Sequence, residues 1–256
     1  MATGITFMST ERMEALLALE REVNDELYRQ AAAERASGQH KNYPITDGVV
    51  DEVRYLACTP KMLWLLKEPW EPDIEVEGGG DWSVTKTHIP NIVQKRTIGD
   101  RGLYANMAWV TYAVLNGYPT WQGLPWVSQN PVVGESLLNI AYLNVSKYPG
   151  QKVSYPPLLK QFYKRNRDIL LRQMKTIAPD IIIGGGTLWL FLEDLGLTPA
   201  DLTTFKSVKT CYKNGRLYVD AYHPAQRGGS DWYVDDLVAA IKEFCQHWEA
   251  PATQTV

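Results

Sequence analysis

Glu68, Asn144 and His223 are the residues whose types and positions most suggest chemistry, because each stands at the end of an apolar run. A carboxylate can orient or activate water, an imidazole can donate a proton, and an amide can both donate and accept hydrogen bonds. In open α/β sheets, ligands bind at the carboxyl ends of the strands. The three residues are therefore candidates for one site that combines binding and catalytic groups.

The elements that must position these residues are alternating strands and helices. The predicted strands are residues 62–66, 139–145, 180–185 and 216–222. The predicted helices are residues 10–36, 102–116, 157–177, 187–195 and 231–248. The first strand, "MLWLL", is apolar throughout, as in a strand that is buried on both faces of a parallel sheet. The alternation predicts a three-layer α/β/α sandwich around a central, mainly parallel four-stranded sheet.

The chain divides into three predicted parts. Residues 1–49 form an N-terminal helical extension packed on the core, residues 50–248 form the α/β domain, and residues 249–256 form a frayed tail. Residues 70–101 show no clear periodicity and include three consecutive glycines. A connection of that length in a compact domain is usually functional or disordered.

The composition argues against several classes of protein. Hydrophobic residues make up 45% and charged residues 21% of the chain, the balance of a globular protein. No apolar run approaches the roughly 20 residues of a membrane span, and no signal peptide is evident, so we expect a cytoplasmic protein that binds no membrane. Three scattered cysteines and four histidines predict no disulfide framework, no metal site and no cofactor. The net charge of −3 argues against general polyanion binding, but a local basic stripe suffices for nucleic acid.

Taken in order, the strand ends resemble the motifs of the uracil-DNA glycosylase superfamily. "LKEPW" is similar to the family's G-Q-D-P-Y, with Glu68 in the place of the water-activating Asp or Asn. "DWSV" puts Trp82 where the family stacks an aromatic ring on the extruded base, and "AYLNVSK" puts Asn144 where it reads the base edge. "APDIIIGGGTLWLF" resembles the strand and glycine turn near the DNA backbone, and "VDAYHPAQR" puts His223 in the catalytic place. The resemblance covers roughly residues 50–245 and implies the family's α/β fold.

Four departures from the family's pattern are visible in the same motifs. Leu66 replaces a glycine, and the catalytic carboxylate is lengthened to glutamate. Trp70 replaces the tyrosine that excludes thymine in strict uracil enzymes, and Ala225 replaces a serine that would touch a phosphate. Three cysteines are too few for the iron–sulfur branch of the family.

The resemblance implies a role for each residue in cleaving an N-glycosidic bond. Glu68 would stabilise the oxocarbenium-like sugar and orient the attacking water, and His223 would donate a hydrogen bond to the departing base. Trp82 would stack on the flipped base while Asn144 reads its edge. Trp70 and Lys67 complete the predicted substrate-binding set. Strand alternation points Lys67 away from Glu68, which disfavours a Schiff-base lyase.

Contacts to DNA are expected from three segments. The glycine turn would open a helix with free N–H groups for a phosphate, or would simply be a close strand–helix turn. The long loop contributes basic residues, and the segment after His223 lies where the family carries its duplex wedge. "YKRNR" at 163–167 is expected to be a solvated helix face. The predicted DNA-binding residues are Gly184, Gly185, Gly186, Thr187, Lys86, Lys95, Arg96, Gln226 and Arg227.

The predicted function is that of a monofunctional, monomeric DNA glycosylase that leaves an abasic site in DNA. Its base is a modified or damaged pyrimidine. Acidic residues around the three glycines, which are good acceptors for sugar hydroxyls, favour a bulky base such as the glucosylated hydroxymethylcytosine of phage DNA, hence an antiviral role. Uracil or mismatch repair is the alternative. Two further alternatives are hydrolysis of a free nucleotide or nucleoside, and an inactive DNA- or nucleotide-binding sensor.

Overall fold

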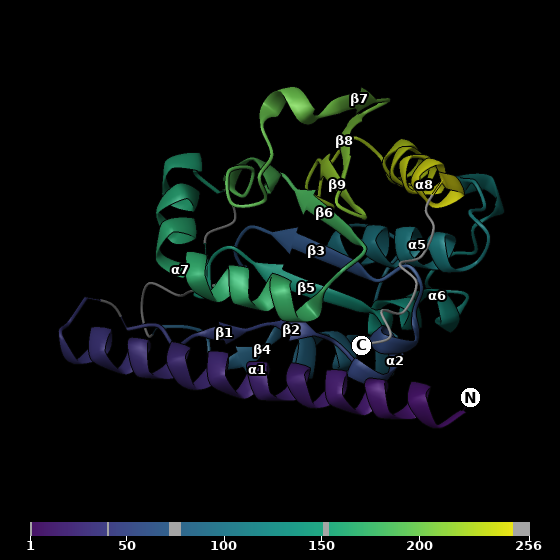
Figure 1. Cartoon of the computed structure of the whole chain (residues 1–256). Helices are drawn as coiled ribbons and strands as arrows, with labels where there is room; N and C mark the ends of the chain where they lie inside the picture. The colour runs from purple at the N-terminus through teal and green to yellow at the C-terminus, as the bar shows by residue number, and fades with distance from the viewer. Residues whose placement is uncertain (1, 40, 72–77, 151–153, 248–256) are drawn as a thin grey trace.

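A seven-stranded mixed sheet forms the centre of the computed structural model, which describes residues 2–39, 41–71, 78–150 and 154–247 (Figure 1). The strand order is β2-β5-β3-β6-β9-β8-β7. The bounds are β2 (Gly48–Val49), β3 (Met62–Leu66), β5 (Ile140–Asn144), β6 (Ile181–Gly185), β7 (Thr203–Phe205), β8 (Val208–Lys213) and β9 (Arg216–Ala221). The neighbours β5, β3, β6 and β9 run parallel, as predicted, whereas β2, β8 and β7 pair antiparallel at the two edges.

The prediction of a four-stranded sheet is therefore too narrow. β2 is only two residues long, too short to show a periodic pattern. β7 and β8 carry exposed polar residues on an edge hairpin, so they lack the apolar run that marks the central strands. A separate two-stranded parallel sheet joins β1 (Ile45–Thr46) to β4 (Trp82–Ser83).

Helices cover both faces of the central sheet, giving the predicted three layers (Figure 1). One face is covered by α5 and α8, and the other by α7. The helices are α1 (Ala2–Ala36), α2 (Glu52–Ala57), α4 (Ile89–Gln94), α5 (Leu103–Leu115), α6 (Pro131–Glu135), α7 (Pro156–Ile177) and α8 (Ser230–His247). Short 3-10 or π turns are η1 (Val84–His88), η2 (Trp121–Gly123), η3 (Ser136–Asn139), η4 (Leu188–Leu190) and η5 (Pro199–Asp201).

The helix predicted over 187–195 is wrong. The segment is a three-residue 3-10 helix followed by turns. Its apolar residues nevertheless face the core, since Leu188 and Phe191 are fully buried against the α7 side of the sheet. The segment 70–101 is also more ordered than predicted, because β4, η1 and α4 lie within it.

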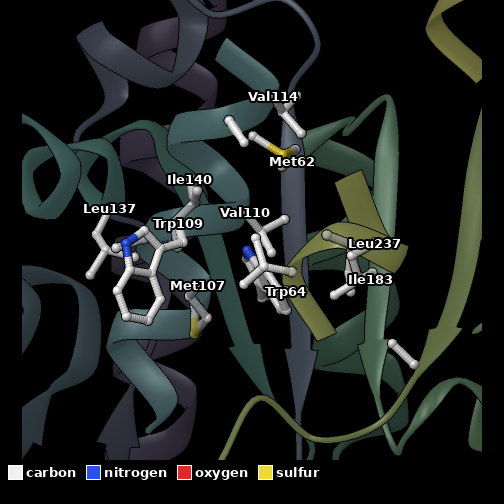
Figure 2. Packing of buried hydrophobic residues seen from close by; sticks show 14 of the residues in the cluster. Met62, Trp64, Met107, Trp109, Val110, Val114, Leu137, Ile140, Ile183 and Leu237 are labelled. Atoms are coloured by element: carbon white, nitrogen blue, oxygen red, sulfur yellow. The ribbon is translucent and has the colours of Figure 1, made fainter. Parts of the chain in front are cut away.

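Side chains of the central strands alternate between two buried clusters. Met62, Trp64 and Leu66 of β3 pack towards α5 and α8, while Leu63 and Leu65 pack towards α7. Figure 2 shows Trp64 among residues of α5 and α8. Burial on both faces explains why these strands are apolar throughout.

The N-terminal extension is tied to the core, and the last two of its predicted residues, 48–49, pair in the main sheet. Helix α1 runs along one side of the molecule, against α7 and α2 (Figure 1). Ion pairs join Glu26 to Arg172 and Glu34 to Arg165. Arg165 lies in "YKRNR", so that segment is a set of structural contacts as well as a solvated face. Strand β2 pairs with β5, which places residues 48–49 inside the main sheet.

None of the helices in the described ranges is long and apolar enough to cross a membrane. The tail predicted over 249–256 lies outside the described residues.

Candidate functional site

Glu68 lies two residues beyond the end of β3, and its position depends on a close approach to Gly150. The side chain of Glu68 rests against this glycine, and any Cβ there would collide with it. The backbone N–H of Gly150 donates to the Pro69 carbonyl (2.8 Å), which fixes the two segments together. Oε2 of Glu68 is buried and has no hydrogen-bond partner within the described residues. Burial raises the pKa of this carboxyl, opposed by a hydrogen bond from Ser154 and by the charge of Lys67.

Asn144 is the last residue of β5 and is almost fully buried. Its backbone N–H donates to Oδ2 of Asp47 (2.8 Å), yet both polar atoms of its side-chain amide lack a hydrogen-bond partner in the part of the chain that is described. The amide lies near enough to the Tyr142 hydroxyl to oppose the rise in that group's pKa, without forming a hydrogen bond of ordinary geometry. A buried amide without partners is costly and rare, which makes Asn144 a candidate for hydrogen bonds to a ligand.

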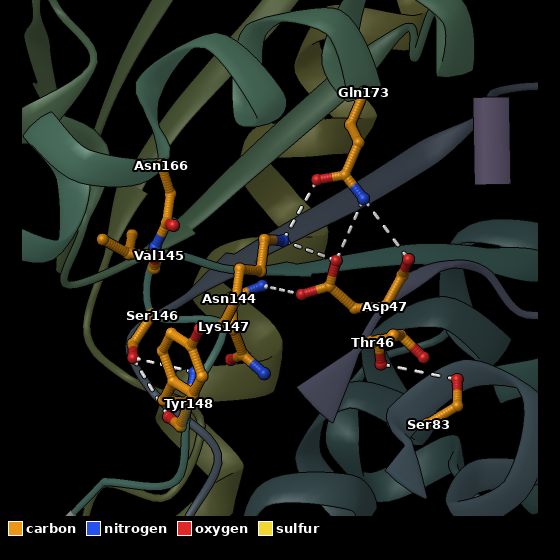
Figure 3. A network of polar contacts seen from close by, with 10 residues as sticks. All are labelled: Thr46, Asp47, Ser83, Asn144, Val145, Ser146, Lys147, Tyr148, Asn166 and Gln173. Atoms are coloured by element: carbon orange, nitrogen blue, oxygen red, sulfur yellow. Dashed lines mark hydrogen bonds and ion pairs between the residues drawn. The ribbon is translucent and has the colours of Figure 1, made fainter. Parts of the chain in front are cut away.

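A buried ion pair holds this asparagine in place (Figure 3). Asp47 accepts from the ammonium of Lys147 (2.6 Å) and from the Gln173 amide (3.1 Å). Lys147 also donates to Oε1 of Gln173 (3.0 Å) and has no exposed surface. Burial lowers the pKa of Lys147, and the charge of Asp47 opposes that change. The network joins β5 to α7 and to the chain before β2.

His223 lies two residues beyond the end of β9. The backbone N–H of Ala225 donates to its Nδ1 (3.2 Å), so the neutral ring carries its proton on Nε2. Burial, followed by the charge of Lys67, lowers the pKa of His223 to about 4. The next residue is anchored as well, because Nδ2 of Asn106 in α5 donates to the Pro224 carbonyl (2.6 Å). His223 is therefore a neutral N–H donor at neutral pH.

We expect His223 to remain neutral down to about pH 4 in the folded protein. Its folded pKa is below the ordinary value of about 6.5, so the unfolded chain binds the extra proton first. Stability should therefore fall as the pH drops from about 6.5 to 4, and His223→Gln should remove this part of the loss. Imidazole NMR titration and urea unfolding of both proteins would check it. A His223 midpoint near 6.5 would contradict the assignment.

Strand register places Glu68, Asn144 and His223 at one edge of the sheet, where its parallel strands end. Leu66 pairs with Asn144, and Gly185 pairs with Ala221, so these residues form a row across four strands, and Leu66 and Ala221 belong to the buried cluster on the α5 and α8 side. Glu68 and His223 each lie two residues beyond this row. Strand β6 separates them, and strands lie about 4.8 Å apart, so their backbones are roughly 10 Å apart. That interval suits a planar base or a sugar ring between a carboxylate and an N–H donor.

An aromatic cluster borders the face of the sheet that α5 and α8 cover. The rings of Trp82 and Tyr104 flank His88, with centroids 5.6 and 5.2 Å from it. A cleft of about 420 Å³ is lined by Trp82, Thr87, His88 and Asn91. The indole of Trp82 approaches Oε2 of Glu71 (3.4 Å). Trp70, in contrast, is 58% exposed at the rim and does not close over the site.

A second cavity, apolar and about 240 Å³, lies between the β8–β9 hairpin and α8. Its lining includes Leu217, near the start of β9, so it is remote from the strand ends that carry the polar residues.

The glycine turn after β6 does not form a phosphate cradle as predicted. The N–H of Gly186 donates to the carbonyls of Gly184 and Ala221, so it is not free. The Thr187 hydroxyl is buried and donates to the Leu65 carbonyl (2.7 Å). Side chains at Gly184 or Gly185 would collide with neighbouring residues. Gly184, Gly185, Gly186 and Thr187 therefore form a close turn between β6 and η4, which was the alternative to a phosphate site.

The basic residues of the long loop are not gathered at the site. Lys86 donates to the Val49 carbonyl and forms ion pairs with Glu20 and Glu52, so it has a structural role. Lys95 ends helix α4 and is exposed. Arg96 lines a different cleft, between α2, α4 and α6.

Gln226 and Arg227, both predicted to contact DNA, differ in whether their side chains are engaged in hydrogen bonds. The Gln226 side chain closes its own turn, since it donates to the Gly229 carbonyl (2.6 Å) and accepts from the Gly228 N–H. It is therefore not free to fill the gap left by a flipped base. Arg227 is exposed and makes no hydrogen bond or ion pair within the described residues.

Lys67, which was predicted as a substrate-binding residue, has its side chain over Gly186, and its charge acts on both Glu68 and His223.

Several residues around the candidate site have no signal in the sequence. Ser154, Tyr104 and Asn106 carry no motif, and Gly150 looks like any loop glycine. Asp47 and Gln173 reach the site only through contacts across about a hundred residues of chain. Across the described ranges, no cluster of histidine, cysteine and acidic residues could hold a metal ion.

A scan against protein-family models and a search of curated protein sequences both return no match for this chain.

Proposed function

We propose that this protein is a monofunctional DNA glycosylase that hydrolyses the N-glycosidic bond of a flipped-out pyrimidine and leaves an abasic site. One observation carries the proposal. Glu68, Asn144 and His223, which resemble motif residues of the uracil-DNA glycosylase superfamily, lie at or just beyond the carboxyl ends of parallel strands of one sheet. Polar atoms of Glu68 and Asn144 are buried there without partners in the described structure.

The chemistry divides between the two ends of the scissile bond. As the bond breaks, its electron pair leaves with the base and positive charge develops on the sugar. The Glu68 carboxylate stabilises that positive charge and orients the water whose oxygen bonds to C1′. The Nε2–H of His223 hydrogen-bonds to the base as its negative charge grows. A neutral histidine suits this role, since it donates without first having to gain a proton.

The base is recognised by stacking and by its edge. The cleft beside Trp82 and His88 offers aromatic surface to a flipped base. The free donor and acceptor of Asn144 match the alternating donor and acceptor groups of a pyrimidine edge.

Exposed aromatic residues favour DNA over a free nucleotide. Trp70, Trp189 and Tyr222 follow the adjacent strands β3, β6 and β9 and are 58, 43 and 61% exposed. Aromatic platforms stack on unpaired bases, each worth about 1–3 kcal/mol. Arg227, in the loop that follows Tyr222, adds a positive charge that forms no ion pair within the described residues. A sensor without catalysis is disfavoured because a buried, partly unpartnered carboxylate would burden its fold to no purpose.

The class of base is proposed from the rim of the site. Trp70 leaves the position of the family's tyrosine gate open, which favours a bulky 5-modified cytosine, as in glucosylated phage DNA, over uracil. The acidic residues around the three consecutive glycines support a bulky base less than the sequence implied. Glu71 accepts from the Gly80 N–H (2.8 Å) and Asp81 accepts from the Tyr28 hydroxyl (2.7 Å), so both have structural roles. Asp73, Glu75 and Glu77 lie outside the described residues. The proposed enzyme acts as a monomer in the cytoplasm.

The decisive experiment offers the protein four substrates: a uracil-containing duplex, the same oligonucleotide single-stranded, glucosylated phage DNA, and free nucleotides. Alkali-sensitive sites and released base are measured, with Glu68→Gln as the matched inactive control. Abasic sites in any of the DNAs support the proposal, and the substrate cleaved identifies the base. Cleavage of free nucleotides alone, or of nothing, overturns it.

Asn144 variants should lose base capture without losing stability. Asn144→Leu removes two unpartnered polar atoms from a buried position, so we expect the free energy of unfolding to stay the same or rise. The substrate concentration needed for half-maximal excision should rise. Asn144→Asp, which leaves acceptors only, should change the preference between uracil and cytosine edges.

Steady-state excision and urea unfolding of the three proteins would test this. A large loss of stability in Asn144→Leu, with normal excision, would make Asn144 a structural residue.

A further inference from the structure

Lys67 is the first residue after β3, and its backbone is fixed on the side of β5. Its carbonyl accepts from the Ser146 N–H (2.9 Å), which continues the parallel ladder one step beyond the strand. The backbone therefore enters the site in a set position, and Glu68 follows directly.

The side chain of Lys67 turns the other way, towards β6. It lies over Gly186, where an added Cβ would be 3.3 Å from its Cε and 3.8 Å from its Nζ. Gly186 has a φ of 73°, a conformation that favours glycine, and its N–H is bonded to both Gly184 and Ala221. The turn thus presents a bare backbone surface on which the lysine side chain lies.

This surface lies between the two catalytic candidates. β6 separates β3 from β9 in the sheet, so the Lys67 ammonium lies over the end of the strand between those that lead to Glu68 and to His223. The ammonium of Lys67 makes no hydrogen bond or ion pair in the described part of the chain, so its charge is not neutralised by a structural partner. A fixed charge in a partly buried setting is screened less than one at the surface.

The charge of Lys67 lowers the pKa of both His223 and Glu68, which is the direction that the proposed mechanism requires. It lowers the pKa of His223, second to burial, and lowers the pKa of Glu68 against burial. Among other titratable groups, the Tyr233 hydroxyl in α8 donates to the carbonyl of Tyr222, the neighbour of His223 (3.1 Å), and Arg227 lies in the same loop as His223. Within the described residues, Lys67 is the one charge that perturbs His223.

We propose that Lys67, placed over Gly186 at the end of β6, is a positioning residue whose charge favours the ionised form of Glu68 and the neutral form of His223, the two forms on which the proposed hydrolysis depends. The inference rests on the proposed glycosylase function. It extends the site by a residue outside the proposed chemical steps and assigns the lysine neither a covalent intermediate nor a phosphate contact.

The test compares Lys67→Met with Lys67→Arg, which keeps the charge, and with Lys175→Met, an exposed control on α7. Imidazole NMR titration follows His223, whose signal is identified from its loss in His223→Gln. Single-turnover excision is measured from pH 4.5 to 8.5. In Lys67→Met the His223 midpoint should rise from about 4 towards 6.5, and the acid limb of the rate profile should move to higher pH with it. Lys67→Arg and Lys175→Met should match the wild type.

An unchanged His223 midpoint in folded Lys67→Met would overturn the inference. So would a weaker affinity for DNA with an unmoved pH profile, which indicates a phosphate contact. A borohydride-trapped DNA adduct that disappears in Lys67→Met would make the lysine a nucleophile instead. Because the NMR titration needs no activity, it still tests the lysine if the protein excises no base.

Discussion

Replacing Glu68 by glutamine is expected to lower base excision by orders of magnitude while leaving the fold at least as stable at pH 7. The rate falls because the carboxylate charge stabilises the transition state more than the bound substrate. DNA binding should remain nearly intact. Stability should not fall, because burial disfavours the charged form of this side chain and Oε2 has no partner in the described structure.

The pH dependence of stability follows from the direction of the same pKa change. The folded pKa of Glu68 lies above its ordinary value, so the unfolded chain loses this proton first as the pH rises. The wild type should therefore lose stability, relative to Glu68→Gln, as the pH rises from about 4.3 through the folded pKa. Below that range the two proteins should differ little.

Single-turnover excision and urea unfolding at pH 4 and pH 7 would measure both effects. Glu68→Asp keeps the negative charge on a shorter side chain, further from the sugar, so this variant should retain part of the excision rate. Glu193→Gln, on an exposed turn, should change neither quantity. If Glu68→Gln lost stability and kept its rate, Glu68 would be a structural residue and the proposed mechanism would fail.

The central strands were predictable because burial on both faces demands apolar residues at every position. Each of the four apolar runs is a parallel strand within one or two residues of its predicted bounds. β1, β2 and β4 have two residues each, too few for any periodicity to appear. Segment 187–195 has enough apolar residues for a helix, but they fill the space against α7 from a short turn.

The candidate site was predictable where side chains follow strand ends, and not where it depends on distant contacts. Glu68, Asn144 and His223 share an edge because parallel neighbours end together, a consequence of topology. Basic residues were harder to interpret, since composition does not tell whether a lysine meets solvent, DNA or an acid. Lys86 forms ion pairs with two glutamates. Lys67, whose side chain lies over Gly186 at the end of β6, forms no ion pair in the described structure.

Replacing Asp47 by asparagine should destabilise the fold by about 3–5 kcal/mol, because it leaves the Lys147 ammonium buried without its counter-charge. Asparagine keeps one acceptor oxygen at this position, so the variant removes the charge and leaves a single oxygen where Asp47 now accepts from both Lys147 and the Asn144 N–H. The penalty should depend on pH. The folded pKa of Lys147 is already lowered by burial, and losing Asp47 lowers it further, so the unfolded chain binds the proton more strongly. The loss should therefore shrink as the pH rises towards about 10.4.

Urea unfolding at pH 7 and pH 9.5 would measure this penalty, and two further variants separate its causes. Asp47→Asn combined with Lys147→Met removes both charges, so it should recover most of the stability. Glu26→Gln breaks a partly exposed pair with Arg172 and should cost less than about 1 kcal/mol.

The double variant also tests how Asn144 is positioned, because its backbone N–H loses the Asp47 carboxylate in both Asp47 variants. If excision stayed low in the stable double variant, the carboxylate would be needed to position Asn144. If excision recovered with stability, the pair would serve the fold alone. A loss below about 1 kcal/mol in Asp47→Asn would show that the ion pair does not hold this end of β5.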